Sequence, residues 1–166
     1  MAYINVSAQS DFATLHISTS SVTISGTAAT TATSILEVPA LQNITLNNGN
    51  GVFRWKQLDQ TSESAVAIPA TNQISLNAVV DPSSFFGVTG AAGSANAKGL
   101  YNLSNEKTKI NFRMYFNGVD VGSKFVSGTG YLTGLAPTVS PDQPVWVTPL
   151  TIEVDGDLSV VQTVAS

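Results

Sequence analysis

The sequence contains no cysteine, one histidine and few charged residues. Of its 166 residues, 11% are Asp, Glu, Lys or Arg, and 43% are hydrophobic. The absence of cysteine excludes a disulfide framework, a thiolate nucleophile and a cysteine-based zinc site. Charged residues usually make up about a quarter of a soluble protein. A polar surface with so little charge favours a secreted or capsid-like protein, whose outside is covered by neighbours, over a cytosolic enzyme.

Long apolar runs are also missing. No segment approaches the roughly 18 apolar residues that indicate a transmembrane helix. The first ten residues, MAYINVSAQS, lack the basic and apolar regions of a signal peptide. We therefore expect a soluble protein that is made in the cytoplasm and has no membrane anchor. The length suits a single domain over residues 1–166.

The few charges are distributed unevenly. Residues 1–53 have two acids and no Lys or Arg, residues 54–124 have all seven bases and five acids, and residues 125–166 have four acids and no base. A mildly basic middle and an acidic C-terminal third could pair head to tail between copies, but charge alone slightly favours ordinary solvated faces as the explanation. The net charge of -4 disfavours nucleic-acid recognition by a basic patch.

Alternation of apolar and polar residues, the period of a half-buried strand, is the dominant pattern. Residues 108–116, TKINFRMYF, alternate in this way, and Asn117-Gly118 is a strong hairpin signal before a returning strand in KFVSGTGYLTGL. Two further strands are predicted to point inward at Ile74, Leu76, Ala78 and Val80, and at Trp146, Leu150, Ile152 and Val154. Roughly eight to ten strands at short spacing predict an antiparallel β-sandwich or barrel.

Three segments are expected to depart from this pattern. Residues 19–34 include an exposed, flexible loop, because SGTAATTATS has no apolar period. Residues 82–104 form a loop with one or two short helical turns, since Asp81 and Pro82 suit a helix start but several glycines interrupt a long helix. In LTGLAPTVSPDQPVW, residues 132–146, the prolines are expected to rigidify a connection that crosses between two strands, where strand pairing stops. Pro149 is expected at a sheet edge or a bulge.

Candidate catalytic residues are few. His16 could form a triad with a serine and Asp11, but no GxSxG elbow exists, and a strand residue facing solvent or a subunit boundary is the better interpretation. Asp59 and Glu63 could act as a glycosidase pair, but no sugar-binding aromatic cleft is evident. The glycine-rich GVTGAAGSANAKG lacks the Gly-Lys-Ser/Thr ending of a phosphate loop. No enzyme motif remains, so we expect no catalysis and no cofactor.

Two other groups of residues have ordinary structural explanations. Asp155 and Asp157 flank a glycine and could bind calcium, but such a site normally uses six or more oxygen ligands, so a plain turn is favoured and no metal is expected. Trp55 and Trp146 are interpreted as packing residues in a core or an interface. A strand-rich chain with few protective charges suggests that other subunits cover its sheet edges.

The order of these segments resembles the major tail tube protein of long-tailed bacteriophages. The resemblance covers roughly residues 35–160 and follows, in order, SILEVPALQNITL, VFRWKQLDQTSESAVAIP, QISLNAVVDP, DPSSFF, KTKINFRMYFNG, GTGYLTGLAP, TVSPDQPV and TPLTIEVDGDLS. It implies a mainly β fold, an antiparallel β-sandwich or half-barrel with one short flanking helix, in which copies assemble into hexameric rings. Stacked rings would form the hollow conduit for DNA ejection.

The resemblance also implies sites and partners. The loop at residues 58–69 would reach the neighbouring ring, which makes candidate interface residues of Leu58, Asp59, Thr61, Ser62, Glu63, Ile68 and Pro69. Partners would be further copies, a tape-measure protein, a tail terminator, baseplate or tail-tip proteins and, in a contractile tail, a sheath. DNA would pass through the lumen without sequence-specific binding. The protein would reside in the virion tail. The alternative is a carbohydrate- or surface-binding β-sandwich module.

Overall fold

The computed structural model describes residues 13–19, 35–38, 41–58, 61–89, 93–116 and 122–162. Most of the predicted flexible segment 19–34 and the Asn117-Gly118 turn lie outside these residues, as does Asp59. The elements in chain order are β1 (Thr14–Ser18), β2 (Leu36–Val38), β3 (Leu41–Trp55), β4 (Ser64–Val79), α1 (Pro82–Phe86), α2 (Ala95–Asn105), β5 (Lys109–Tyr115), β6 (Lys124–Thr133), β7 (Thr138–Ser140), β8 (Gln143–Val154) and β9 (Ser159–Gln162).

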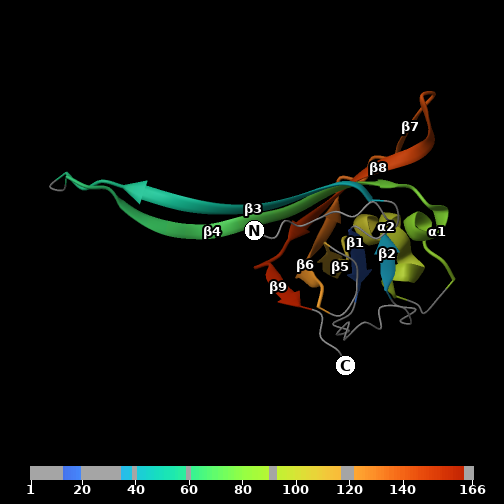
Figure 1. The fold of residues 1–166 in the computed structure, drawn as a ribbon, viewed down its shortest axis with the longest axis horizontal. Coiled ribbons are helices and arrows are strands. Elements are labelled where there is room, and N and C mark those ends of the chain that lie inside the picture. The colour runs from blue at the N-terminus through green and yellow to red at the C-terminus, as the bar shows by residue number, and fades with distance from the viewer. Residues whose placement is uncertain are drawn as a thin grey trace.

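The described strands form one curved antiparallel sheet that does not close. Its order is β2-β1-β5-β6-β8-β4-β3, with β7 paired to β8 and β9 paired to β6. Figure 1 shows the sheet curving beside the two helices, with one hairpin extending far from the body. The predicted mainly β fold, a half-barrel flanked by helical structure, is confirmed. Pairing of β5 with β6 confirms the predicted return of the chain after residue 116.

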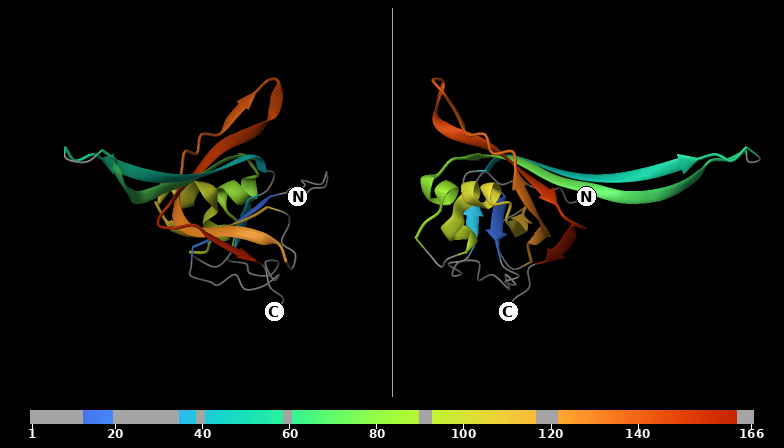
Figure 2. Two further views of the ribbon diagram at one scale, coloured as in Figure 1. Left: turned by 60° about the vertical axis from the view of Figure 1, so that its left-hand side comes forward. Right: turned by 180° about the vertical axis from the view of Figure 1, so that it is seen from behind.

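The core lies between one face of the sheet and the helices. Alternate residues of the central strands are buried there, among them Ile74, Leu76 and Ala78 as predicted, together with Leu150 and Ile152. The helices contribute further buried side chains: Phe85, Ala95, Leu100 and Leu103. In the rear view of Figure 2, α1 and α2 lie at the side of the body away from the long hairpin. The helices therefore cover the core, whereas the hairpin contributes to the core only at its base and extends beyond it.

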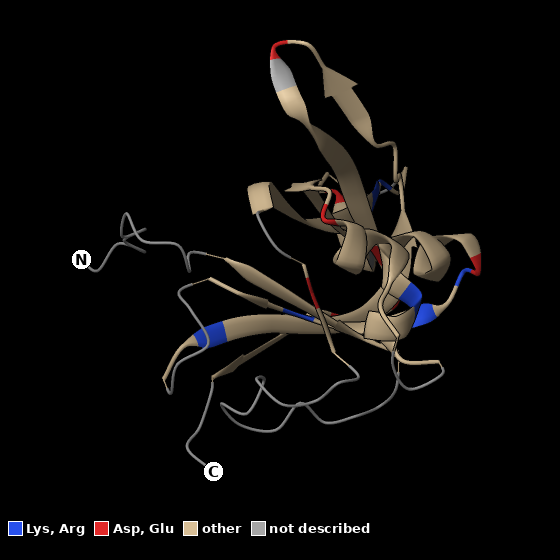
Figure 3. Ribbon diagram, turned by 90° about the vertical axis from the view of Figure 1, so that its right-hand side faces the viewer, with Lys and Arg blue, Asp and Glu red and all other residues tan. Residues whose placement is uncertain are grey.

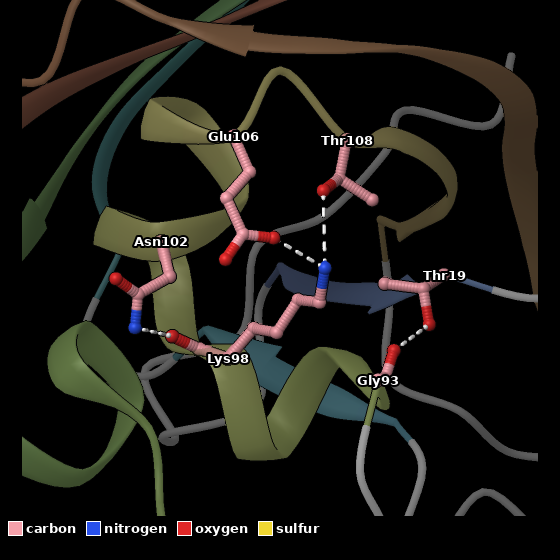
Figure 4. A network of polar contacts seen from close by, with 6 residues as sticks. All are labelled: Thr19, Gly93, Lys98, Asn102, Glu106 and Thr108. Atoms are coloured by element: carbon pink, nitrogen blue, oxygen red, sulfur yellow. Dashed lines mark hydrogen bonds and ion pairs between the residues drawn. The ribbon is translucent and has the colours of Figure 1, made fainter.

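Helix α1 begins as the sequence predicts. The Asp81 carboxylate accepts hydrogen bonds from the backbone N–H and the hydroxyl of Ser84, both at 3.0 Å. The region contains two helices where the resemblance implied one, and α2 extends over 11 residues despite a break in its dihedral angles at Gly99. Figure 4 shows how the second helix is held: Lys98 binds both Glu106 and the Thr108 hydroxyl, which joins the helix to the start of β5.

The proline-rich segment is the main correction to the expected strand pattern. Strand pairing continues through it: Thr138 is opposite Val147, and Ser140 is opposite Gln143, with a register shift between the pairs. Pro144 lies within β8 where the strand register is irregular, so the segment is a hairpin rather than an unpaired crossing. Pro149 is opposite Asn77 of β4 but lies between the stretches of β8 that pair with β6 and β7. This one-sided pairing accommodates a residue without a backbone N–H.

Candidate assembly surfaces

The hairpin of β3 and β4 is much longer than the sheet behind it. Strand β4 pairs with β8 from Gln73 to Val79, whereas its earlier residues pair with β3 alone. We call residues 49–58 and 61–71 the long arm; Figure 1 shows it leaving the body as a two-stranded ribbon. A single layer of two strands has no core of its own and is marginally stable by itself in water. The long arm therefore depends on its continuity with the main sheet.

One irregularity in strand register shapes the long arm. Gly49 pairs with Thr71 and Gly51 pairs with Ile68, so β4 carries one extra residue between these pairs, and a β-bulge results. The Ile68 side chain lies over Gly51, where an added Cβ would come within 2.4 Å of it. Farther out, the Phe53 and Trp55 rings stack with centroids 5.9 Å apart and an interplanar angle of 21°. Gly51 thus leaves space for Ile68 to lie across the ribbon.

The long arm exposes an unusual amount of apolar surface. Its exposed large hydrophobic residues are Val52, Phe53, Trp55, Leu58, Val66 and Ile68. Single exposed apolar residues are normal, but contiguous groups on a folded protein commonly mark a surface that another molecule covers. The long arm is therefore the strongest candidate for an assembly surface in the described part of the chain.

The predicted interface residues fall on the long arm, although not in one loop. Leu58, Thr61, Ser62 and Glu63 lie at its tip and are exposed, and Asp59 lies outside the described residues. The expected loop over residues 58–69 is corrected in its second half, because Ser64 begins strand β4 and both Ile68 and Pro69 belong to that strand. Ile68 is exposed and does not point into the core. The sequence therefore located the projecting region but not its hairpin structure.

A second, smaller projection comes from the proline-rich segment. Residues 138–147, which we call the short arm, comprise β7, the turn and the first part of β8, and Val139, Val145 and Trp146 are exposed on it. Asp142 in the turn is its only charged residue. Figure 3 shows how sparsely charged residues are distributed over the described ribbon. The short arm therefore offers apolar contacts with an acidic tip.

The two tryptophans do not pack in the core of the chain. Trp146 was predicted to point inward with Leu150 and Ile152, but its side chain is 51% exposed. The β4–β8 ladder ends at Val79–Val147, and Trp146 lies just beyond it on the projecting short arm. Trp55 is likewise exposed on the long arm. Their interpretation as core residues is wrong, and burial in an interface between molecules stays a prediction.

His16 is a buried strand residue rather than a solvent-facing one. Its side chain packs edge-on against Tyr115, with ring centroids 5.3 Å apart, and its Nε2 lies 4.0 Å from Glu37 Oε2. Burial lowers the pKa of His16 below its ordinary value; Glu37 opposes this shift, and Arg113 adds to it. A buried, mainly neutral imidazole beside a tyrosine ring is poorly placed to attack a substrate in solution.

The remaining candidate residues show no chemical site. Asp155 pairs with Lys109 at 2.6 Å, and the Gly156 carbonyl accepts a hydrogen bond from Asn72, so this turn is tied to β5 and β4. Within the described ranges, no group of three or more His, Asp or Glu residues could hold a metal ion. In that same part of the chain, no helix is long and apolar enough to cross a membrane.

The fold resembles known structures, whereas comparisons of the sequence with protein families and with curated proteins give no match. A chain of the tail of an empty gene transfer agent particle, solved with C6 symmetry, matches with a TM-score of 0.57 and 14% identity over 89% of this chain and 95% of that one. A chain of the native gene transfer agent virion matches with a TM-score of 0.56 and 12% identity over the same shares of the two chains.

A third similar structure is the tube-terminating cap of the anti-feeding prophage. It matches with a TM-score of 0.50 and 15% identity, and covers 76% of this chain and 82% of that one. These likenesses extend over most of each chain, so they concern the architecture as a whole rather than a single motif. At such low identity they establish the architecture alone. The chain therefore has the fold found in tail components of phage-like particles.

Proposed function

We propose that this protein is a structural subunit of a phage-like tail. Copies associate into hexameric rings, and the rings stack into a hollow tube through which DNA is ejected. The observation that carries the proposal is the long arm, an apolar projection on a fold that tail components share. The C6 symmetry of the similar gene transfer agent tail supports the ring number. No catalytic step is part of this function.

The long arm supplies the contact between rings in this proposal. Leu58, Thr61, Ser62 and Glu63 lie at its tip, and Ile68 and Pro69 lie along β4, so one projection carries all the predicted interface residues that the structure describes. A ribbon that extends beyond the body can reach a neighbouring ring without moving the core. Its exposed apolar side chains would be removed from water by this contact, at about 25 cal/mol for each Å² buried.

The remaining partners follow from a position inside a tail. A tape-measure protein would occupy the lumen during assembly, and a terminator and a baseplate or tail-tip protein would bind the two ends of the tube, with a sheath outside in a contractile tail. The net charge of -4 suits a conduit for DNA, because a basic lumen would retain the phosphate backbone. The protein would be made in the host cytoplasm and reside in the virion.

Electron microscopy of the purified protein tests this proposal directly. Negative staining should reveal rings or tubes of uniform bore, and Leu58→Asp should reduce stacking while the chain stays folded, because Leu58 is fully exposed at the tip. Ser159→Asp provides a control for added charge, because Ser159 is exposed on β9 and lies outside the long arm. A protein that remains monomeric at high concentration would contradict the proposed function.

A carbohydrate- or surface-binding module is the second candidate function. The exposed, stacked rings of Phe53 and Trp55 favour it, because sugar rings bind to exposed aromatic faces. Binding to a panel of immobilised glycans, with and without calcium, would distinguish this function from assembly. Phe53→Ala should abolish glycan binding by a monomer if the module is correct.

A further inference from the structure

We propose that the long arm binds a second copy of the chain through one of its two faces, and that the receiving surface is the short arm of that copy. This inference rests on the proposed function and specifies its contact. We call the face that carries Phe53, Trp55, Val66 and Ile68 the docking face. The reverse face carries Val52, Arg54, Ala65 and Ala67. Cross-strand partners share a face, and the pairs Phe53–Val66 and Val52–Ala67 define the two sides.

The apolar side of the hairpin changes between its base and its tip. At the base, Ile44 and Leu46 of β3 lie opposite Leu76 and Ile74 of β4. Ile44, Leu76 and Ile74 pack in the core, and Leu46 shares their side but is 38% exposed. Successive residues of a strand point to opposite faces, so Val52 and Arg54 lie on this same side farther out. Four large apolar residues of the outer arm, Phe53, Trp55, Val66 and Ile68, lie on the other side, which at the base carries the polar pair Thr45–Ser75; Val52 alone of the large apolar residues in the described strands of the arm lies on the reverse face.

This change of side indicates that the outer arm is not simply an extension of the core strands. If the arm only prolonged the sheet, its apolar face would continue that of Ile44 and Leu46, or both faces would be polar. Instead, Phe53 and Trp55 stack on the docking face, and Ile68 lies flat over Gly51 on the same side. The result is a continuous apolar strip that points away from the core side of its own sheet. An exposed apolar strip on a folded protein commonly marks a surface that a second molecule covers.

The pairing of β4 with β8 determines where the short arm lies relative to the long arm. The two strands pair from Gln73–Glu153 to Val79–Val147, and the long arm continues β4 beyond the first pair. The short arm continues β8 beyond the second pair. The two arms therefore leave the same pair of strands in opposite directions, as Figure 1 shows. Copies arranged head to tail along these strands bring the long arm of one to the short arm of the next.

The chemistry of the short arm suits this contact. Val145 and Trp146 expose apolar area that the body of the same chain leaves uncovered. Asp142 is the only charge on the short arm, whereas Arg54 and Lys56 flank Trp55 in the sequence of the long arm. Arg54 lies on the reverse face, so these bases favour approach of the acidic short arm without entering the apolar contact. Because the two surfaces differ, the contact is heterologous, and heterologous contacts generate rings or open-ended stacks rather than closed dimers.

Two valines on the long arm provide a matched test of the docking face. Val66 on the docking face is 49% exposed, and Val52 on the reverse face is 53% exposed, so Asp at either site adds the same charge at similar exposure. Val66→Asp should raise the concentration needed for assembly by more than about tenfold, as expected for an interface residue that becomes a buried charge. Val52→Asp should leave the concentration needed for assembly within about twofold of the wild-type value, because the side chain at position 52 stays in water.

The assay measures assembly of the full chain by sedimentation velocity and negative staining across a concentration series. Near-ultraviolet circular dichroism should show that both variants keep the folded core. Equal loss of assembly in both variants, or none in Val66→Asp, would overturn the choice of face. If the wild type itself forms no rings or tubes, the proposed function fails instead, so the two failures are distinguishable.

Mixing two defective variants tests the receiving surface. Trp146→Asp should also prevent growth, because it alters the short arm while leaving the long arm intact. In an equimolar mixture, the intact short arm of Val66→Asp can accept the intact long arm of Trp146→Asp. The mixture should therefore give paired units, seen by mass photometry, and nothing longer. If the mixture shows only the separate units of each variant, the short arm is not the receiving surface.

Discussion

Replacement of Gly99 by alanine should destabilise the protein strongly. Gly99 lies within α2 at φ 67° and ψ 171°, a backbone region that is almost restricted to glycine. A Cβ built there would lie 2.3 Å from the backbone nitrogen of Gly87 and 2.6 Å from the carbonyl oxygen of Phe85. Both contacts are backbone atoms at the end of α1, so no side chain can rotate away. The substitution must push the two helices apart.

Two terms set the size of the effect. Holding alanine in this backbone conformation costs about 1–3 kcal/mol. Displacing the packed helices costs a further 1–3 kcal/mol or so, which is typical of overpacking in a core. Gly99→Ala should therefore lower the free energy of unfolding by about 2–6 kcal/mol, a large share of the roughly 5–15 kcal/mol that stabilises an ordinary domain.

Gly93 offers a matched control. It also has a positive φ, 87°, but a Cβ built there meets nothing within 4 Å. Gly93→Ala should therefore lower the free energy of unfolding only by the cost of holding alanine at a positive φ, about 1–2 kcal/mol. Urea unfolding followed by circular dichroism would compare the two midpoints at constant slope. Equal shifts of the midpoint would refute the conclusion that close contact between α1 and α2 requires Gly99.

Two further predictions concern titratable groups. The pKa of His16 is lowered below 6.5, so the unfolded chain binds a proton at this histidine more readily than the folded chain does. The stability that comes from neutral His16 is therefore complete above pH 6.5 and is lost as the pH falls below that value. The urea midpoint of the wild type should decline over that range, and that of His16→Gln should decline less. Asp81→Ala should cost about 0.5–2 kcal/mol at pH 7, and Asp81→Asn should restore most of it, because both Asp and Asn cap helices well. Hydrogen bonds from Ser84 lower the pKa of Asp81, so the advantage of Asp over Asn should disappear as pH falls below 3.8.

The central strands were predictable because the alternation of apolar and polar residues in their sequences indicates one buried face. Ile74, Leu76 and Ala78 occupy alternate positions and are buried, and Ile110 and Phe112 do the same in β5. The helix cap at Asp81 was also predictable, because an acceptor side chain directly before a proline is a local sequence signal for the start of a helix. These features depend on residues close together in sequence. They require no knowledge of which strands become neighbours.

The burial of single residues in the outer strands was harder to predict. Trp146 continues the inward pattern of Leu150 and Ile152, but the β4–β8 ladder ends at Val79–Val147, and Trp146 begins the projecting short arm, where its side chain is exposed. His16 shows the opposite error: a polar residue in a strand suggested solvent, yet Tyr115 of the adjacent strand packs against it. In both cases burial is decided by how far the neighbouring strand extends. That extent is a property of the sheet, not of the local sequence.

The long arm shows why an alternating pattern cannot by itself identify a core. Phe53 and Trp55 alternate with polar or charged residues in the same way as the buried residues of β5, yet their side chains are exposed. What separates the two cases is the β-bulge near Gly51 and the side of the ribbon on which the apolar residues lie. A buried strand keeps its apolar residues on the side of its own core, whereas the outer arm carries Phe53 and Trp55 on the docking face, which points away from the core side. The side change is therefore more informative than exposure alone, because it indicates a surface shaped for a second molecule.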